Sequence, residues 1–263
     1  NALKKEVEVL KIDPKLNTTV QDLKDFNPDI IFISVPTPMN AESQDLSILY
    51  DVLKQIKLLD INTLLVLKST VLPESIKKIE DDCARFIYNP EFLREKTANA
   101  DFIESSFIIF GGKTNEAKVL SNFYSEYTYC EAKEHIFIDT VSASLVKYSI
   151  NSFLASKVIF FNQLFEIFSL SKSTIDWQTL TDAISKDERI GSSHMTVPGD
   201  DGKKGFGGAC FPKDTYALYK YSESLGVNFS LLKNVIDINN KIRFRYNDLS
   251  EREKAQNISY ETK

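Results

Sequence analysis

Apolar runs of strand length, each closed by turn residues, are the feature that most constrains the fold of this chain. Residues 29–35 and 63–68 are nearly continuous apolar runs, which is typical of strands buried on both faces of a parallel sheet. Segments with a helical spacing of apolar residues separate the runs. This order predicts a doubly wound, parallel α/β sheet in the first half of the chain. The expected strands are 6–14, 29–35, 63–68, 85–88 and 106–110, and the expected helices are 46–59 and 74–84.

Small polar and acidic side chains follow several of these expected strands. In a doubly wound sheet, ligands bind beyond the carboxyl ends of the strands. We therefore expect the residues at the strand ends to lie along one edge of the sheet and to face a ligand. These residues are Asp13, Thr37, Ser69, Thr70 and Glu91.

The second half of the chain is helical in pattern. From Asp139 and Thr140, which are N-cap candidates, apolar residues recur at three- and four-residue steps and predict one long helix over 140–172. Such an apolar stripe packs against a neighbouring domain or a second subunit, so we expect a homodimer built on it. Lys147 and Asn151 lie one turn apart and can reach one ligand. Further helices are expected at 176–185, 214–225 and 229–240, and a frayed or disordered polar tail at the end.

Composition narrows the class of protein. The net charge of −5 leaves no basic excess for nucleic acid or an anionic membrane. Three irregularly spaced cysteines and two distant histidines predict neither a disulfide framework nor a metal site. We see no apolar run of membrane-spanning length and no signal peptide, so the default location is cytoplasmic.

Residues 205–214 read Gly-Phe-Gly-Gly-Ala-Cys-Phe-Pro-Lys-Asp. Glycines at this density let the backbone turn tightly and approach a ligand closely. Cys210 beside Lys213 is a candidate nucleophile, because a nearby cation favours the thiolate. The alternative is a glycine-rich turn that carries an ordinary buried cysteine.

Six motifs together resemble those of the UDP-glucose 6-dehydrogenases, in the same order and at similar spacing over roughly positions 1–240. The glycine-rich stretch 205–214 is one of them. The others are Val35-Pro36-Thr37-Pro38, Lys68-Ser69-Thr70-Val71, Asn89-Pro90-Glu91-Phe92-Leu93-Arg94-Glu95, Lys147-x-x-x-Asn151 and Arg189-Ile190-Gly191. The resemblance implies a partial Rossmann-like domain at 1–138, a helical central and dimerisation domain at 139–240, and a polar tail at 241–263.

The resemblance also implies a reaction: oxidation of the primary alcohol of a UDP-sugar to a carboxylate with two molecules of NAD. Asp214, with Lys147 nearby, would take the hydroxyl proton. Cys210 would attack the aldehyde, and the thiohemiacetal would be oxidised to a thioester. Lys147 and Asn151 would stabilise the oxyanion. Glu95, with Thr70 positioning water, would assist hydrolysis of the thioester.

Binding residues are implied in the same way. Asp13 corresponds to the carboxylate that binds the adenosine ribose in a dinucleotide fold. Arg189 would reach the substrate pocket of a partner subunit. The remaining cofactor contacts would be Pro36, Thr37, Ser69, Thr70, Glu95 and Lys213. The remaining substrate contacts would be Glu91, Phe92, Leu93, Arg94, Lys147, Asn151, Lys204, Gly205, Phe206 and Gly207.

Two departures from the family pattern bear on function. The Gly-x-Gly-x-x-Gly turn that grips the NAD pyrophosphate is not present, and neither is the second α/β domain that closes over UDP. The chain begins at Asn1 with what resembles the helix after that turn, so we expect an incomplete chain. The alternatives to UDP-glucose oxidation are oxidation of another UDP-hexose, such as UDP-N-acetylmannosamine, and an inactive remnant that serves as a dimerising module.

Overall fold

The computed structural model describes residues 2–4, 6–246 and 248–261, except for the side chain of Glu95. It divides into two compact units, residues 1–37 with 44–147 and residues 38–43 with 148–263. The chain passes from the first unit to the second between Lys147 and Tyr148. This point lies inside the long helix, a little beyond the boundary that the sequence suggested.

A five-stranded sheet in the order β1-β2-β3-β4-β5 forms the centre of the first unit. Three of its four strand pairs are parallel, and the β3–β4 pair is antiparallel. A wholly parallel sheet was therefore the wrong expectation at one pair. A parallel neighbour is usually reached through a crossover helix that packs on the sheet, whereas residues 89–106 hold a 3-10 turn and the six-residue α4, which has no buried residue. The strands are β1 (Ile30–Ile33), β2 (Leu64–Leu67), β3 (Phe86–Tyr88), β4 (Phe107–Gly112) and β5 (Glu134–Ile138).

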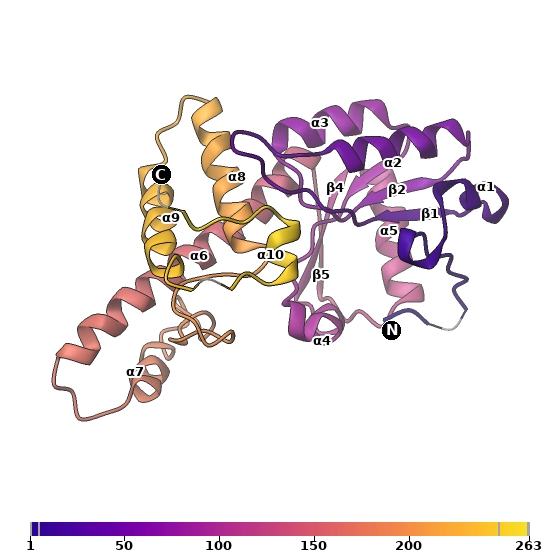
Figure 1. Ribbon diagram of the computed structural model, residues 1–263. Coiled ribbons are helices and arrows are strands. Elements are labelled where there is room, and N and C mark those ends of the chain that lie inside the picture. Colours follow the sequence, from indigo (N-terminus) through magenta and orange to yellow (C-terminus); the bar gives the residue numbers. More distant parts are fainter. Residues whose placement is uncertain (1, 5, 247, 262–263) are drawn as a thin grey trace. The chain divides into compact units, whose positions relative to one another are not determined.

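Helices cover both faces of this sheet (Figure 1). On one face, α2, α3 and the first turns of α6 pack against alternate strand residues such as Ile33, Leu67 and Tyr88. On the other face, α5 packs against Val66 and Phe110. This two-sided burial explains why the strands are nearly continuous apolar runs. The helices are α1 (Leu23–Phe26), α2 (Ser47–Leu58), α3 (Pro73–Asp82), α4 (Ala98–Ile103), α5 (Thr114–Tyr127) and α6 (Thr140–Leu170), with 3-10 turns at Pro14–Leu16, Val20–Asp22 and Glu95–Thr97.

The strand expected at 6–14 does not form. Residues 6–10 and Ile12 instead lie across a groove of about 1010 Å³ from the outer edge of β1. An alternating pattern needs a neighbouring strand to complete its hydrogen bonds, and the groove separates this stretch from β1. The structure also contains α4, α5 and β5, which the sequence pattern had not indicated.

Helix α6 begins as predicted, because the Asp139 carboxylate accepts a hydrogen bond from the Ser142 amide at 2.8 Å. Its most apolar 18-residue window has a mean hydropathy of 1.4, enough by length and composition to cross a membrane. The expectation that no segment reaches this length and hydropathy was therefore wrong. Only 22% of that window is buried, and the helix also buries the polar residues Ser144, Asn151 and Asn162, each of which bonds to another group of its own unit.

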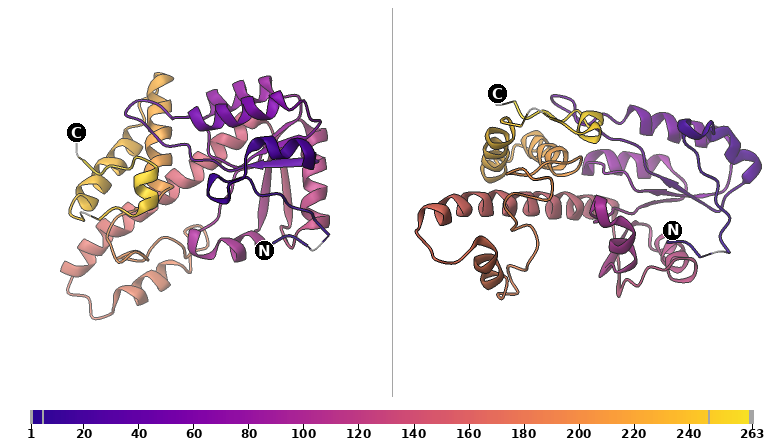
Figure 2. Two further views of the ribbon diagram at one scale, coloured as in Figure 1. Left: turned by 45° about the vertical axis from the view of Figure 1, so that its right-hand side comes forward. Right: turned by 60° about the horizontal axis from the view of Figure 1, so that its bottom comes forward.

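The second unit is helical and is built on the later turns of α6. On one side, Ala155 and Ile159 pack with Phe206 and with Val235. On another side, Phe161 packs with Met195, Val197 and Trp177. Figure 2 shows α7 on one side of α6 and α8 with α9 on the opposite side. The helices are α7 (Trp177–Ile184), α8 (Phe211–Ser224), α9 (Ser230–Arg243) and α10 (Glu251–Ala255).

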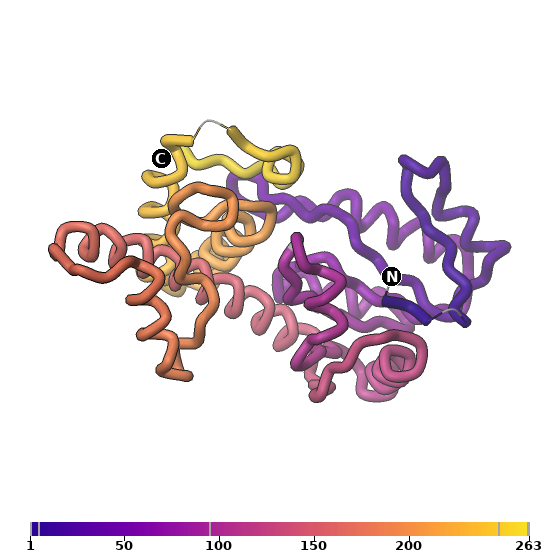
Figure 3. Tube along the Cα trace, turned by 90° about the horizontal axis from the view of Figure 1, so that it is seen from below, coloured from indigo at the N-terminus to yellow at the C-terminus, as the bar shows by residue number. Residues whose placement is uncertain are grey.

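The tail is more structured than we expected. Ser250 caps α10 in a capping box with Glu253, and Ile258 and Tyr260 are buried. After α10 the chain returns to the side of α9 (Figure 3). Buried apolar side chains so close to the end explain the order, since each removes apolar surface from water.

Candidate active site

Cys210 lies directly before α8, at its N-cap position. Its residue is exposed, whereas Cys83 and Cys130 are half-buried. Asp214 follows one turn later, and its amide donates to the Cys210 carbonyl at 2.8 Å. The glycine-rich turn therefore places the cysteine at the surface, and α8 begins at the next residue.

A buried polar cluster lies on α8 and α6 in the same unit. The Asp214 carboxylate, 1% exposed, accepts from Asn151 Nδ2 at 2.6 Å. Its other oxygen accepts from Lys213 Nζ at 2.5 Å. Both carboxylate oxygens therefore have strong donors, and the amide of Asn151 is held in one orientation. The structure brings Asn151, Lys213 and Asp214 together, one helical turn from Cys210.

The backbone amides of the glycine-rich loop have internal partners. Four of them donate within the second unit: Lys204 to Tyr246 Oη (3.1 Å), Gly205 to Asn162 Oδ1 (2.9 Å), Phe206 to Asn239 Oδ1 (2.7 Å) and Gly208 to Glu253 Oε1 (3.1 Å). The resemblance had implied that the backbone of residues 204–207 holds the substrate. A ligand that binds through these amides would have to exchange with the partners that they have here.

A second group of predicted residues lies in the first unit. Lys147 Nζ donates to the backbone carbonyl of Glu91 at 2.5 Å and lies 5.3 Å from the centre of the Phe92 ring. Lys147 is 8% exposed, so its ammonium is held at the segment that follows β3. Lys147 and Asn151 are four residues apart on α6, on opposite sides of the boundary between the units.

Lys68 is a residue of this group to which the motif analysis gave no role. Its ammonium donates to Asn89 Oδ1 at 2.9 Å and to Tyr124 Oη at 3.3 Å, and lies 3.8 Å from a Glu91 carboxylate oxygen. Burial lowers the pKa of Lys68, while the charge of Glu91 acts in the opposite direction. Lys68 and Glu91 line a small cavity of about 30 Å³. The available signal was a lysine at the end of an otherwise apolar buried strand.

The two predicted arginines are engaged at the surface. Arg94 forms a two-pronged ion pair with Asp101 at 2.7 and 3.1 Å, and the hydrogen bond from Arg94 holds the pKa of the Asp101 carboxyl well below its usual range. Arg189 pairs with Asp187 at 2.6 Å, with 88% of the arginine side chain exposed. Leu93 is half-buried. The side chain of Glu95 is outside the described part of the chain.

The residues predicted for the cofactor meet only in part. The Ser69 hydroxyl accepts from the Val35 amide at 2.8 Å and donates to the Val35 carbonyl at 2.7 Å. Thr37 Oγ1 donates to the Thr70 carbonyl at 2.8 Å. These bonds tie the carboxyl ends of β1 and β2 together, beside the exposed Pro36. Asp13 lies in an exposed turn, where it accepts from the Lys15 amide at 2.8 Å.

These residues fit one part of a dinucleotide better than another. The tied ends of β1 and β2 give the polar edge at which a doubly wound sheet binds a ligand. A pyrophosphate is usually held by a glycine turn at a helix N-terminus, but the first glycine of this chain is Gly111. Within the described chain, the residues at the ends of β1 and β2 therefore fit the strand-end part of a dinucleotide site, but no glycine turn that would bind the pyrophosphate accompanies them.

The three thiols should differ in reactivity. Burial raises the pKa of Cys83 to about 11, and burial also raises the pKa of Cys130. Because the thiolate is the reacting form, we expect iodoacetamide at pH 8 to label Cys210 first and Cys83 at least ~10-fold more slowly. Peptide mass spectrometry over a time course measures the three rates, and faster labelling of Cys83 would contradict the expectation.

Comparison with known proteins identifies the family of both domains. Residues 2–128 match the NAD binding domain of the UDP-glucose/GDP-mannose dehydrogenase family, and residues 141–241 match the central domain of the same family. The chain is 35% identical over 222 residues to the UDP-glucose 6-dehydrogenase of Rickettsia bellii, covering 81% of this chain and 49% of the relative. It is 33% identical over 224 residues to the UDP-glucose 6-dehydrogenase YwqF of Bacillus subtilis, covering 81% and 48%.

A solved structure gives the same result. The UDP-glucose dehydrogenase of Pyrobaculum islandicum superposes with a TM-score of 0.70 at 30% identity, over 85% of this chain and 52% of that one. The chain thus spans about half the length of the relatives that it matches. Two domains matched in order, each with the fold described above, lead to one conclusion: the chain belongs to the UDP-glucose/GDP-mannose dehydrogenase family.

Proposed function

We propose that this chain carries the catalytic cysteine of an NAD-dependent UDP-glucose 6-dehydrogenase, which converts UDP-glucose to UDP-glucuronate. One observation supports it most: Cys210, exposed at the start of α8, stands one turn from the buried cluster of Asn151, Lys213 and Asp214. An exposed thiol beside fixed polar groups is the arrangement that covalent catalysis requires.

The chemistry assigns the thiol a defined step. Oxidation of the sugar alcohol gives an aldehyde, which has no hydride to lose until a nucleophile makes its carbon tetrahedral. The Cys210 thiolate forms a carbon–sulfur bond, and the resulting thiohemiacetal is oxidised to a thioester. Water then breaks the carbon–sulfur bond and releases the carboxylate and the thiol. NAD, when bound, accepts the hydride of each of the two oxidations.

Asn151 and Asp214 have different roles: Asn151 stabilises negative charge, and Asp214 positions Asn151. Asp214 accepts one Asn151 hydrogen at 2.6 Å, which leaves the second hydrogen of that amide for a developing oxyanion. Because Asp214 is buried and doubly paired, its surroundings favour a positioning role over the proton-accepting role that the resemblance implied. Lys147, held at the Glu91 carbonyl, provides the fixed cation of the family's mechanism.

Formation of NADH tests the proposal. With UDP-glucose and NAD, the intact protein should produce two NADH per sugar, measured by absorbance, and Cys210→Ala should produce at most one, because only the second oxidation needs the thiol. Cys83→Ala and Cys130→Ala are the matched thiol controls and should keep the wild-type stoichiometry. Full turnover to the carboxylate in Cys210→Ala would refute the covalent mechanism. Faster turnover of UDP-N-acetylmannosamine than of UDP-glucose would assign UDP-N-acetylmannosamine as the substrate instead.

A homodimer is the second part of the proposal. Phe153, Phe160 and Ile167 repeat every seven residues along α6 and are 70%, 62% and 66% exposed. A seven-residue apolar repeat on one helix is the pattern of a helix–helix seam, and so large an apolar face is seldom left in water. A second copy of the chain presents the same stripe and can cover it symmetrically.

Light scattering after gel filtration tests the dimer. The wild-type protein should have twice the mass of one chain, and Phe160→Glu should have the mass of one chain because a charge would be buried in the seam. Leu231→Glu, at an exposed position of α9 (66%), is the matched control. A monomeric wild-type protein would refute the seam. A dimer that forms no NADH would favour the dimerising module instead.

A further inference from the structure

The last part of the chain runs along the loop that leads to Cys210. The family's central domain ends its match at residue 241, so most of this segment lies outside the matched region. Three of its residues bond to the loop at 203–208. Tyr246 Oη accepts from the Lys204 amide at 3.1 Å, and the Asp248 carboxylate accepts from Lys203 Nζ at 2.6 Å. Farther along both segments, Glu253 meets Gly208.

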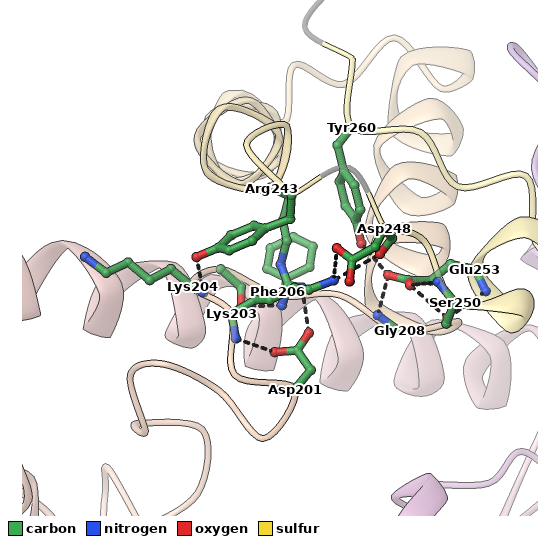
Figure 4. Close-up of polar contacts among 12 residues, drawn as sticks. Asp201, Lys203, Lys204, Phe206, Gly208, Arg243, Asp248, Ser250, Glu253 and Tyr260 are labelled. Carbon is green, nitrogen blue, oxygen red and sulfur yellow. Dashed lines mark hydrogen bonds and ion pairs between the residues drawn. The ribbon is translucent and has the colours of Figure 1, made fainter.

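Of these contacts, the one made by Glu253 is nearest to Cys210 in the sequence. Its Oε1 accepts from the Gly208 amide at 3.1 Å and from Tyr260 Oη at 2.9 Å. Its Oε2 accepts from the amide and the hydroxyl of Ser250, both at 2.8 Å. Figure 4 shows this carboxylate between Gly208, Ser250 and Tyr260. The side chain therefore joins α10, the chain end and the glycine-rich loop at one point.

Arg243 anchors the other end of the same loop. Its guanidinium donates to the Gly205 carbonyl at 2.9 Å and to the Asp201 carboxylate at 2.6 Å. A Cβ on Gly207 would lie 2.7 Å from this guanidinium, so the loop and the arginine are in close contact. Gly205 and Gly208 are thus held by separate anchors, Arg243 and Glu253.

We propose that the segment 248–260 fixes the loop that carries Cys210, and that Glu253 is its positioning residue, acting through the Gly208 amide two residues before the thiol. The catalytic meaning of this anchor rests on the proposed function, whereas the anchor itself does not. Burial works to raise the pKa of Glu253, but the hydrogen bonds from Ser250, Tyr260 and Gly208 outweigh it and hold that pKa below its usual value. Glu253 is therefore ionised at neutral pH, and ionised acceptors make the stronger hydrogen bonds.

The test follows the loop and not turnover. Amide hydrogen exchange by NMR reports the Gly208 bond. A nitroxide label on Cys210, with Cys83 and Cys130 replaced by serine, reports the mobility of the thiol position. Glu253→Ala should speed exchange at Gly208 about tenfold or more, because a hydrogen bond to a charged group is lost, and should make the label more mobile.

Two controls separate positioning from a loss of helix stability. Ser250→Ala removes the cap of α10 and one of the four hydrogen bonds to the Glu253 carboxylate, but it leaves the bond to Gly208, so exchange at Gly208 should change less than about threefold. Glu251→Gln, 89% exposed and bonded to Lys254 on the same helix, should change neither readout. Equal Gly208 exchange and label mobility in Glu253→Ala and Glu251→Gln would overturn the proposal.

A less disruptive variant decides the matter if Glu253→Ala does not fold. Tyr260→Phe removes one hydroxyl that holds Glu253 Oε1 and keeps the buried ring. Exchange at Gly208 should rise about threefold, and no change would again overturn the proposal. Neither readout needs NAD or a sugar. Failure of the anchor can therefore be told apart from failure of the proposed function, even if the protein proves inactive.

Discussion

Replacing Asp214 with alanine is expected to destabilise the second unit by about 3–5 kcal/mol, because it leaves a buried lysine without its partner. The Lys213 and Asp214 side chains are only 6% and 1% exposed, and they pair at 2.5 Å. Removing the carboxylate also takes the acceptor from Asn151 Nδ2, itself buried. Urea unfolding followed by fluorescence measures the loss, because Trp177 is the only tryptophan and lies in the second unit.

An exposed pair of the same type is the control. Lys233 and Asp237 on α9 lie 3.3 Å apart with side chains 55% and 49% exposed, so Asp237→Ala should cost at most about 0.5 kcal/mol. The double variant Lys213→Met/Asp214→Leu removes both buried charges and should recover a large part of the loss. A loss below about 1 kcal/mol in Asp214→Ala would contradict the burial argument.

Gly205→Ala is expected to destabilise the same unit by about 3 kcal/mol, from strain and lost hydrogen bonds together. Gly205 has φ +72°, and a Cβ there would lie 2.6 Å from Asn239 Oδ1. Asn239 is 1% exposed, and its amide bonds both the N–H and the carbonyl of Phe206, at 2.7 and 3.0 Å. Moving it would break both bonds in the loop before Cys210.

A neighbouring glycine separates the two causes. Gly202 has φ +75°, but a Cβ there would meet nothing within 4 Å. Gly202→Ala should therefore cost only the backbone strain, about 1–2 kcal/mol. Urea unfolding followed by Trp177 fluorescence again gives both values. Equal losses in the two variants would mean that the contact with Asn239 contributes nothing.

The sequence predicted the parts of the fold that local patterns determine. Apolar runs predicted β1, β2, β3 and β4, and three- and four-residue spacing predicted α2, α3, α6, α7, α8 and α9. The pattern at 6–14 misled, because alternation shows that a stretch can pair but not that a partner is beside it. Helix α5 and strand β5 were missed since their apolar residues mix with polar ones.

For the candidate site, the sequence predicted which residue types take part and in what order they occur along the chain. Glycines around a cysteine, and an asparagine one turn after a lysine, are chemical signals that survive without coordinates. Their hydrogen-bond partners could not be predicted from the sequence, because bonds such as Asn151 to Asp214 and Gly208 to Glu253 join residues 63 and 45 positions apart. Only the tertiary structure decides which distant side chains close on the loop, since burial and hydrogen bonding depend on packing and not on sequence spacing.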